Sequence, residues 1–130
     1  YSLGLAMGAK LAAPEKLCVN VMGDLAFSTV GLDIETAVRC EIPTLTIVIN
    51  NAFMSIYDDS RFPVALEKYN IKTLSGEFSE VAQAMGAYTE KITAPNNIVP
   101  AIKRGIAETE AGKAVVLEFI TKDEGKYSKF

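Results

Sequence analysis

Two polar groups stand directly after apolar runs of the sequence, where their side chains could do chemistry. Asp24 follows KLCVNVMG, and the pair Asn50 and Asn51 follows TLTIVI. Asparagine is a poor strand former, so two in succession at the end of such a run indicate a task for their amides. If the two runs are neighbouring parallel strands about 4.8 Å apart, their carboxyl ends bring a carboxylate and an amide oxygen together. One carboxylate with a few neutral oxygens holds Mg²⁺ well when phosphate oxygens complete the octahedron, so the pattern predicts a site for Mg²⁺ and a diphosphate group.

Each of these residues taken alone also has a purely structural explanation. A Gly-Asp pair after a strand is common turn chemistry, and aspartate often caps a helix. Asn50 and Asn51 could likewise form a turn. The joint spacing of Asp24 and Asn51 across one β-α-β unit favours the metal site.

Composition excludes several other kinds of site. The chain of 130 residues has no histidine and two cysteines, which rules out within it a Ser-His-Asp triad, a Cys-His pair and a Cys/His zinc site. The net charge is −3 and the basic residues form no stripe, so we expect no nucleic-acid partner. No run approaches the roughly 20 apolar residues that cross a bilayer, so we expect no membrane partner. Cys18 and Cys40 are interpreted as reduced core thiols of a cytoplasmic protein.

The elements that must position these residues alternate along the chain between helical and extended patterns. Helical spacing predicts helices at residues 2–13, 29–40, 78–86 and 98–109. Apolar and β-branched runs predict strands at residues 16–22, 44–49, 87–92 and 114–120. The segment 53–75 is assigned only a surface loop around DDSRFP. This alternation predicts an α/β fold, with an open, mainly parallel sheet and helices on both faces.

The stretch GDLAFSTVGLDIETAVRCEIPTLTIVINN, residues 23–51, resembles the thiamine diphosphate-binding signature, which begins Gly-Asp-Gly and closes with Asn-Asn. LGLAMGAKLAAP before it and VVLEFIT after it extend the likeness over nearly all of the chain. The sequence therefore resembles the C-terminal, diphosphate-binding domain of the acetolactate synthase and 2-oxo acid decarboxylase group. Residues 1–130 are accordingly expected to form a single domain that binds thiamine diphosphate and Mg²⁺.

The resemblance implies roles for particular residues. The metal ligands would be the side chains of Asp24 and Asn51 and the main-chain carbonyl of Phe53. The backbone N–H groups of Leu25 and Ala26 would face the diphosphate at the start of a helix. The residues implied around the cofactor are Gly23, Asp24, Leu25, Ala26, Asn51, Phe53 and Met54.

One residue departs from the signature: Leu25 stands where the family has its third glycine. Glycine there permits unusual backbone angles and close approach to phosphate, whereas a leucine side chain must point away. Leu25 fits if its backbone is in an ordinary region. Tyr57 is a second difference, because decarboxylases of the group often have a glutamate at that position.

The resemblance also implies partners. In such enzymes the cofactor spans two domains of different subunits, and a pyrimidine-binding domain supplies the glutamate that activates the aminopyrimidine ring. We therefore expect a fragment or subunit of a homo-oligomer, a dimer or tetramer, that acts on a small 2-oxo acid. The reaction would be a decarboxylation or carboligation by a lyase or transferase, and this chain alone would be inactive.

Two alternatives stay open. A receiver-like phosphate-binding module would use Asp24 as phosphate acceptor, but it needs a second acidic residue near the first strand end and a lysine at a later one, and neither is evident. A degenerate, non-catalytic scaffold domain would have kept the fold and lost the cofactor. Leu25 is the only hint of such a loss.

Overall fold

A computed structural model describes residues 2–54 and 59–123. The strands are β1 (Val19–Gly23), β2 (Leu45–Asn50), β3 (Tyr88–Ile92) and β4 (Val115–Ile120). The helices are α1 (Ser2–Ala12), α2 (Asp24–Val30), α3 (Asp33–Arg39), α4 (Pro63–Tyr69), α5 (Phe78–Ala84) and α6 (Ile98–Glu110), with a short 3-10 helix, Pro95–Asn97, before α6.

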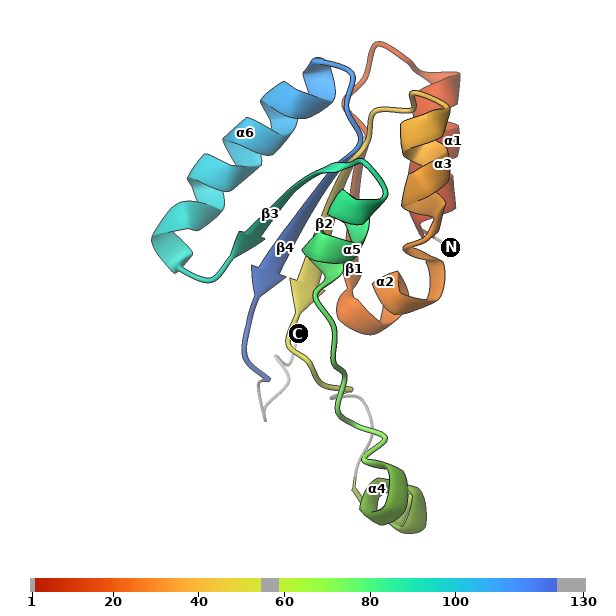
Figure 1. The fold of residues 1–130 in the computed structure, drawn as a ribbon, viewed down its shortest axis with the longest axis vertical. Helices are drawn as coiled ribbons and strands as arrows, with labels where there is room; N and C mark the ends of the chain where they lie inside the picture. Colours follow the sequence, from red (N-terminus) through yellow and green to blue (C-terminus); the bar gives the residue numbers. More distant parts are fainter. Residues whose placement is uncertain (1, 55–58, 124–130) are drawn as a thin grey trace, which may run out of the picture.

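The four described strands form one parallel sheet in the order β1-β2-β4-β3. The chain moves across the sheet in one direction from β1 through β2 to β3, and then reverses to place β4 between β2 and β3. Because crossovers between parallel strands are right-handed, a connection in the reverse direction must run over the opposite face. The α6 helix, which joins β3 to β4, accordingly lies across the sheet from α1, α2, α3 and α5 (Figure 1). The predicted parallel sheet with helices on both faces is confirmed.

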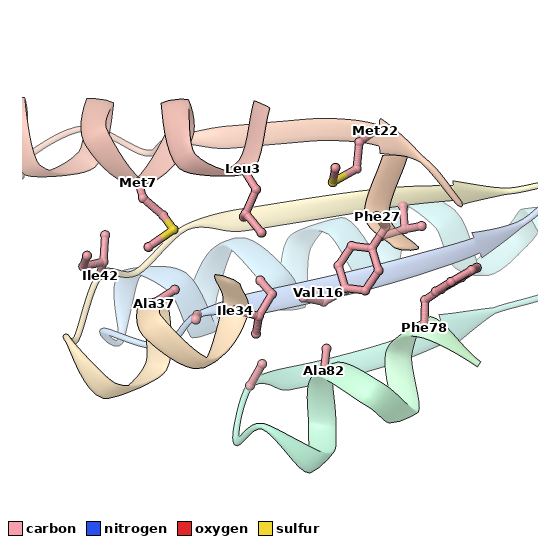
Figure 2. Close-up of a cluster of buried hydrophobic side chains, with 13 residues drawn as sticks. Leu3, Met7, Met22, Phe27, Ile34, Ala37, Ile42, Phe78, Ala82 and Val116 are labelled. Carbon is pink, nitrogen blue, oxygen red and sulfur yellow. The ribbon is translucent and has the colours of Figure 1, made fainter. Parts of the chain in front are cut away.

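The core has two parts, one on each face of the sheet. On the face covered by α1, α2, α3 and α5, buried side chains from these helices meet those of β1, β2 and β4 (Figure 2). The rings of Phe27 and Phe78 pack edge to face there, 5.7 Å between centroids. On the other face, Ala101 of α6 packs with Leu45 and Leu117. Burial on both faces explains why β2 and β4 are almost uniformly apolar.

The helix expected at residues 29–40 is instead two short helices. α2 begins immediately after β1, at Asp24, and α3 starts at Asp33. Gly31 ends α2, and its backbone lies so close to the Phe27 ring that a Cβ there would be 2.5 Å from a ring carbon. The stripe Val30, Ile34, Ala37 and Val38 is real, but it continues across this break, which periodicity alone does not reveal.

Two other expectations differ from the structure. The unassigned segment 53–75 contains α4, which has no buried residues and lies beyond the carboxyl edge of the sheet (Figure 1). A helix that buries nothing shows no core-facing pattern in the sequence. Cys40 is exposed rather than buried, because it ends α3, and both Cys18 and Cys40 are free thiols. Among the residues described, no helix is long and apolar enough to cross a bilayer.

Gly105 allows α6 to approach the sheet closely, and this contact can be tested. A Cβ at Gly105 would lie 2.9 Å from Leu117 and 3.1 Å from Leu45. We expect Gly105→Val to lower the free energy of unfolding by about 1–3 kcal/mol, because it overpacks a filled core. Urea unfolding followed by circular dichroism measures this, with Gly8→Ala as the control, since nothing lies within 4 Å of a Cβ at Gly8. Equal midpoints for the two variants would contradict the close approach.

Candidate functional site

The carboxyl ends of β1 and β2 converge as their register requires. Gly23 of β1 pairs with Ile49 of β2, so Asp24 and the Asn50-Asn51 pair leave the sheet side by side. Asp24 is the first residue of α2 and is 4% exposed. The two residues singled out by spacing therefore meet at one edge.

The Asp24 carboxylate joins the two strand exits directly. Its Oδ1 accepts a hydrogen bond from the Leu25 backbone N–H at 2.7 Å, and its Oδ2 accepts one from the Ala52 backbone N–H at 2.8 Å. Ala52 comes immediately after Asn51. An ionised carboxylate has about four lone-pair positions, so these two bonds leave capacity for a metal ion.

The two asparagines have different surroundings, because successive strand side chains point to opposite faces. Asn50 is buried, and its Oδ1 accepts the Ala52 N–H at 2.9 Å. Asn51 is half-buried, and its Oδ1 accepts the Phe53 N–H at 3.0 Å. Directly after the two asparagines the chain turns at Ala52, whose φ of +55° is a left-handed conformation uncommon for alanine.

A second segment holds the turn from the other side. Residues 52–54 run antiparallel to residues 72–74: Phe53 forms an isolated bridge with Thr73, and the Met54 N–H donates to the Lys72 carbonyl at 2.7 Å. The Leu74 N–H donates to the Ala52 carbonyl at 3.0 Å. The main chain at Phe53 is thus fixed by backbone hydrogen bonds, independently of its side chain.

The remaining residues implied by the resemblance surround Asp24. Leu25 lies in α2 with an ordinary helical backbone, as its fit in place of glycine requires, and its side chain is 38% exposed. Gly23 has an extended backbone, with nothing within 4 Å of a Cβ built on it. Ala26 is in the first turn of α2, whose N–H groups have no backbone acceptor within the helix; that of Leu25 donates to the Asp24 side chain. Tyr57 and Asp58 lie outside the described residues.

Sequence reasoning missed Glu118, a fully buried residue in the middle of β4. Its Oε1 accepts from Asn50 Nδ2 at 2.7 Å, and its Oε2 accepts from the Ser79 backbone N–H at 2.9 Å and the Ser79 hydroxyl at 2.6 Å. Burial raises the pKa of this carboxyl, but the hydrogen bonds from Ser79 and Asn50 outweigh burial and hold the pKa below its ordinary value. The available signal was one charged residue inside the apolar run VVLEFI.

A hollow of about 350 Å³ lies beside the turn. Its lining comes from the carboxyl ends of β2, β3 and β4 and from the segment before α5, and includes Asn51, Ala52, Thr93 and Thr121. Within the described parts of the chain, no three His, Cys, Asp or Glu side chains lie together as a metal cage. The donor set at this edge is one carboxylate with neutral amide and carbonyl oxygens, which suits Mg²⁺ only when a ligand adds further oxygens.

The sequence of this chain matches a known protein family. Residues 1–119 match the thiamine pyrophosphate enzyme, C-terminal TPP binding domain. The chain belongs to this family. Membership confirms the resemblance seen in the sequence, identifies thiamine diphosphate as the cofactor of this domain type, and does not favour a receiver-like module.

Individual relatives agree with the family. The chain is 30% identical over 130 residues to a sulfoacetaldehyde acetyltransferase of Alcaligenes xylosoxydans, covering 95% of this chain and 21% of that protein. It is 27% identical over 137 residues to an acetolactate synthase large subunit of Mycobacterium tuberculosis, and the match covers 97% of this chain and 23% of that protein. A thiamine diphosphate-dependent 4-hydroxybenzoylformate decarboxylase of Rhodococcus jostii has the same fold, with a TM-score of 0.79 and 19% identity over 96% of this chain and 23% of that one. The chain thus spans under a quarter of the length of these proteins.

Because Ala52 has a positive φ, replacing alanine by glycine there should change the free energy of unfolding in the opposite direction from the same replacement in a helix. We expect Ala52→Gly to raise the free energy of unfolding by up to about 1 kcal/mol, because glycine adopts a positive φ without steric cost. The same change at Ala107, an exposed residue within α6, should lower it by about 1 kcal/mol. Urea unfolding of both variants measures the pair, and destabilisation of equal size at the two positions would contradict the left-handed turn.

The buried Glu118 carboxylate gives a prediction about pH. A carboxyl group whose pKa is lowered by folding stabilises the protein when the pH is above the group's ordinary pKa, which is near 4.5 for this glutamate. That contribution is lost as the pH falls through the folded-state pKa. Ser79→Ala removes the hydroxyl that donates to Glu118, so we expect a loss of about 1–3 kcal/mol at pH 7 that narrows below pH 4.5.

Urea midpoints between pH 7 and pH 3 measure this narrowing. Ser28→Ala is the control, because the exposed Ser28 hydroxyl donates to the neutral Leu25 carbonyl and to no carboxylate. Its difference from the parent protein should stay constant over the same range. A constant difference for Ser79→Ala as well would show that its hydroxyl does not support an ionised Glu118.

Proposed function

We propose that this chain binds the Mg²⁺-diphosphate end of thiamine diphosphate. The metal ligands in this proposal are the side chains of Asp24 and Asn51 and the main-chain carbonyl of Phe53. The residues around the cofactor would be Gly23, Asp24, Leu25, Ala26, Asn51, Phe53 and Met54. The observation that carries the proposal is the hydrogen bond from the Ala52 N–H to Asp24, which brings the carboxylate at the end of β1 to the residue beside Asn51.

The donor chemistry at this edge fits the group. Asp24 supplies one negative charge, and Asn51 and Phe53 supply neutral oxygens, so the protein leaves several Mg²⁺ positions for phosphate oxygens and water. The open space at Gly23 and the position of Ala26 in the first turn of α2 are compatible with a diphosphate approaching the backbone, although the Leu25 N–H already donates to Asp24. When bound, thiamine diphosphate supplies the electron sink for carbanion chemistry at 2-oxo acids, and the protein supplies position and charge.

The degenerate scaffold is the alternative that Leu25 suggested. It would need Leu25 to disturb the turn at the diphosphate. The ordinary helical backbone and partial exposure of Leu25 give no such disturbance, which supports a domain that still binds its cofactor.

Further parts of a larger enzyme belong to the same proposal. We take residues 1–130 as one domain of a thiamine diphosphate-dependent lyase or transferase that is active on a 2-oxo acid only with a pyrimidine-binding domain, in a dimer or tetramer. Uncovered apolar side chains support additional packing: Val21 of the edge strand β1 is 60% exposed, and Leu5 of α1 is 71% exposed. The free thiols of Cys18 and Cys40 support a cytoplasmic location.

Thermal unfolding tests the metal and cofactor site. With Mg²⁺ and thiamine diphosphate together at about 100 times the dissociation constant, we expect stabilisation of about 2.7 kcal/mol, a rise of several degrees in Tm. Neither Mg²⁺ nor thiamine diphosphate alone should reproduce it. Asp24→Ala should abolish the rise relative to its own ligand-free Tm, because it removes the charged metal ligand.

Asp33→Ala is the matched control, since Asp33 is an exposed carboxylate at the start of α3. It should leave the ligand-induced rise unchanged. A rise that survives in Asp24→Ala would move the metal away from β1, and no rise in the parent protein would reject Mg²⁺-diphosphate binding by this chain.

A further inference from the structure

We infer that Glu118 is a positioning residue for the metal and diphosphate site. Through Asn50 it sets the orientation of the turn at Ala52, and so the placement of Asn51 and of the Phe53 carbonyl. This inference rests on the proposed function, because it concerns how accurately the same ligands are held. Glu118 itself lies beneath the site, in the core, and would not touch the metal.

The carboxylate of Glu118 lies in the core. Glu118 is fully buried in β4, between β2 and β3, and the groups that donate to its carboxylate, from Asn50, Ser79 and the Phe78 backbone, are all neutral. Lys91 stands opposite Glu118 on β3, but its ammonium donates to Glu77. A carboxylate buried among neutral donors is expensive to keep, and an apolar residue would suit β4 better if the strand only had to pack.

The hydrogen bond between Asn50 and Glu118 has a fixed direction. An ionised carboxylate only accepts, so Glu118 requires Asn50 to present its NH₂ group. The amide oxygen of Asn50 then faces the opposite way and accepts the Ala52 N–H at 2.9 Å. Glu118 thereby fixes which end of the Asn50 amide points to the turn.

The turn at Ala52 depends on the orientation of the Asn50 amide. Ala52 has a φ of +55°, and its N–H is shared by Asn50 Oδ1 and Asp24 Oδ2. If the Asn50 amide were reversed, its NH₂ group would face the Ala52 N–H, donor against donor, and Asp24 would hold the turn alone. A shift there moves Asn51 and Phe53, which adjoin Ala52 on either side.

The two carboxylate oxygens of Glu118 have different partners, so its effect on the Asn50 orientation can be tested apart from its contribution to stability. Oε1 binds Asn50, whereas Oε2 binds Ser79 at the start of α5. Removing the Ser79 hydroxyl weakens the protein around the same carboxylate but leaves the Asn50 orientation intact. Ser79→Ala is therefore a control that perturbs the same carboxylate without changing the group that faces Asn50.

Isothermal titration calorimetry tests the inference on the full chain, with Mg²⁺ titrated at a fixed saturating concentration of thiamine diphosphate. In Glu118→Gln the Ser79 N–H and hydroxyl hold the glutamine oxygen, so the glutamine NH₂ group faces Asn50, and the Asn50 amide must reverse or lose that hydrogen bond. We expect the Mg²⁺ affinity to fall by about 10-fold or more, as for other groups that orient metal ligands. Ser79→Ala should change it less than about 3-fold on the same scale.

A ligand-free readout accompanies the titration. Hydrogen exchange of the Ala52 amide should become faster in Glu118→Gln, relative to the amides of β4, and should not do so in Ser79→Ala. Unchanged affinity and unchanged Ala52 exchange in folded Glu118→Gln would overturn the inference, as would equal losses in the two variants. A parent protein without Mg²⁺-dependent binding would instead reject the proposed function, and this inference with it.

A polarity swap keeps the test decisive if Glu118→Gln does not fold. In the double variant Asn50→Asp with Glu118→Gln, the new glutamine NH₂ donates to the new carboxylate, whose other oxygen accepts the Ala52 N–H. The net charge is unchanged, and Ser79 can still donate to the glutamine oxygen. Because Asn50→Asp adds a negative charge near the diphosphate, the readout for this variant is the ligand-free exchange of the Ala52 amide. Exchange as slow as in the parent protein, relative to the amides of β4, supports positioning by Glu118, and faster exchange in the folded double variant overturns it.

Discussion

The backbone N–H of Ala52 is the point on which the arrangement at the carboxyl edge depends. It is shared by Asp24 at the end of β1 and Asn50 at the end of β2, and it belongs to a residue held at a positive φ. One donor with two acceptors from neighbouring strands fixes the distance between their exits and the direction in which the chain leaves β2. The strain of the turn is acceptable because both acceptors oppose its relaxation.

The topology of the sheet makes this meeting possible. β1 and β2 are adjacent and parallel, so both exits lie at the same edge, and β4 enters between β2 and β3 only because the chain reverses direction after β3. That insertion places Glu118 of β4 beside β2, within reach of Asn50 across 68 residues of sequence. The α6 helix, alone on its face among the described helices, is the structural consequence of the same reversal (Figure 1).

Local patterns predicted the parts of the structure that depend on local physics. The alternation of helices and strands, the parallel sheet and the convergence of Asp24 with the end of β2 follow from short apolar runs and their spacing. The break at Gly31 was not predicted, because the apolar stripe continues across it, and the close packing of Gly31 against the Phe27 ring leaves no periodic signal. Glu118 was missed for a related reason: one charge in an apolar strand is interpretable only when its partners are known, and Asn50 and Ser79 come from distant segments. The metal-ligand roles stay predictions.

The hydrogen bonds through Asn50 also keep the negative charge of Glu118 away from the edge where Asp24 lies, and so away from an anionic diphosphate. A diphosphate is itself anionic, and a second carboxylate at the edge would repel it while adding a protein ligand that Mg²⁺ does not need. Asn50 is neutral. Its NH₂ group donates to Glu118, and its amide oxygen therefore faces the Ala52 N–H and accepts from it. The charge therefore stays in the core, stabilised by Ser79, while only its orienting effect reaches the edge where Asp24 stands. An amide can donate at one end and accept at the other, which explains an asparagine at position 50. The proposed metal site explains the asparagine at position 51.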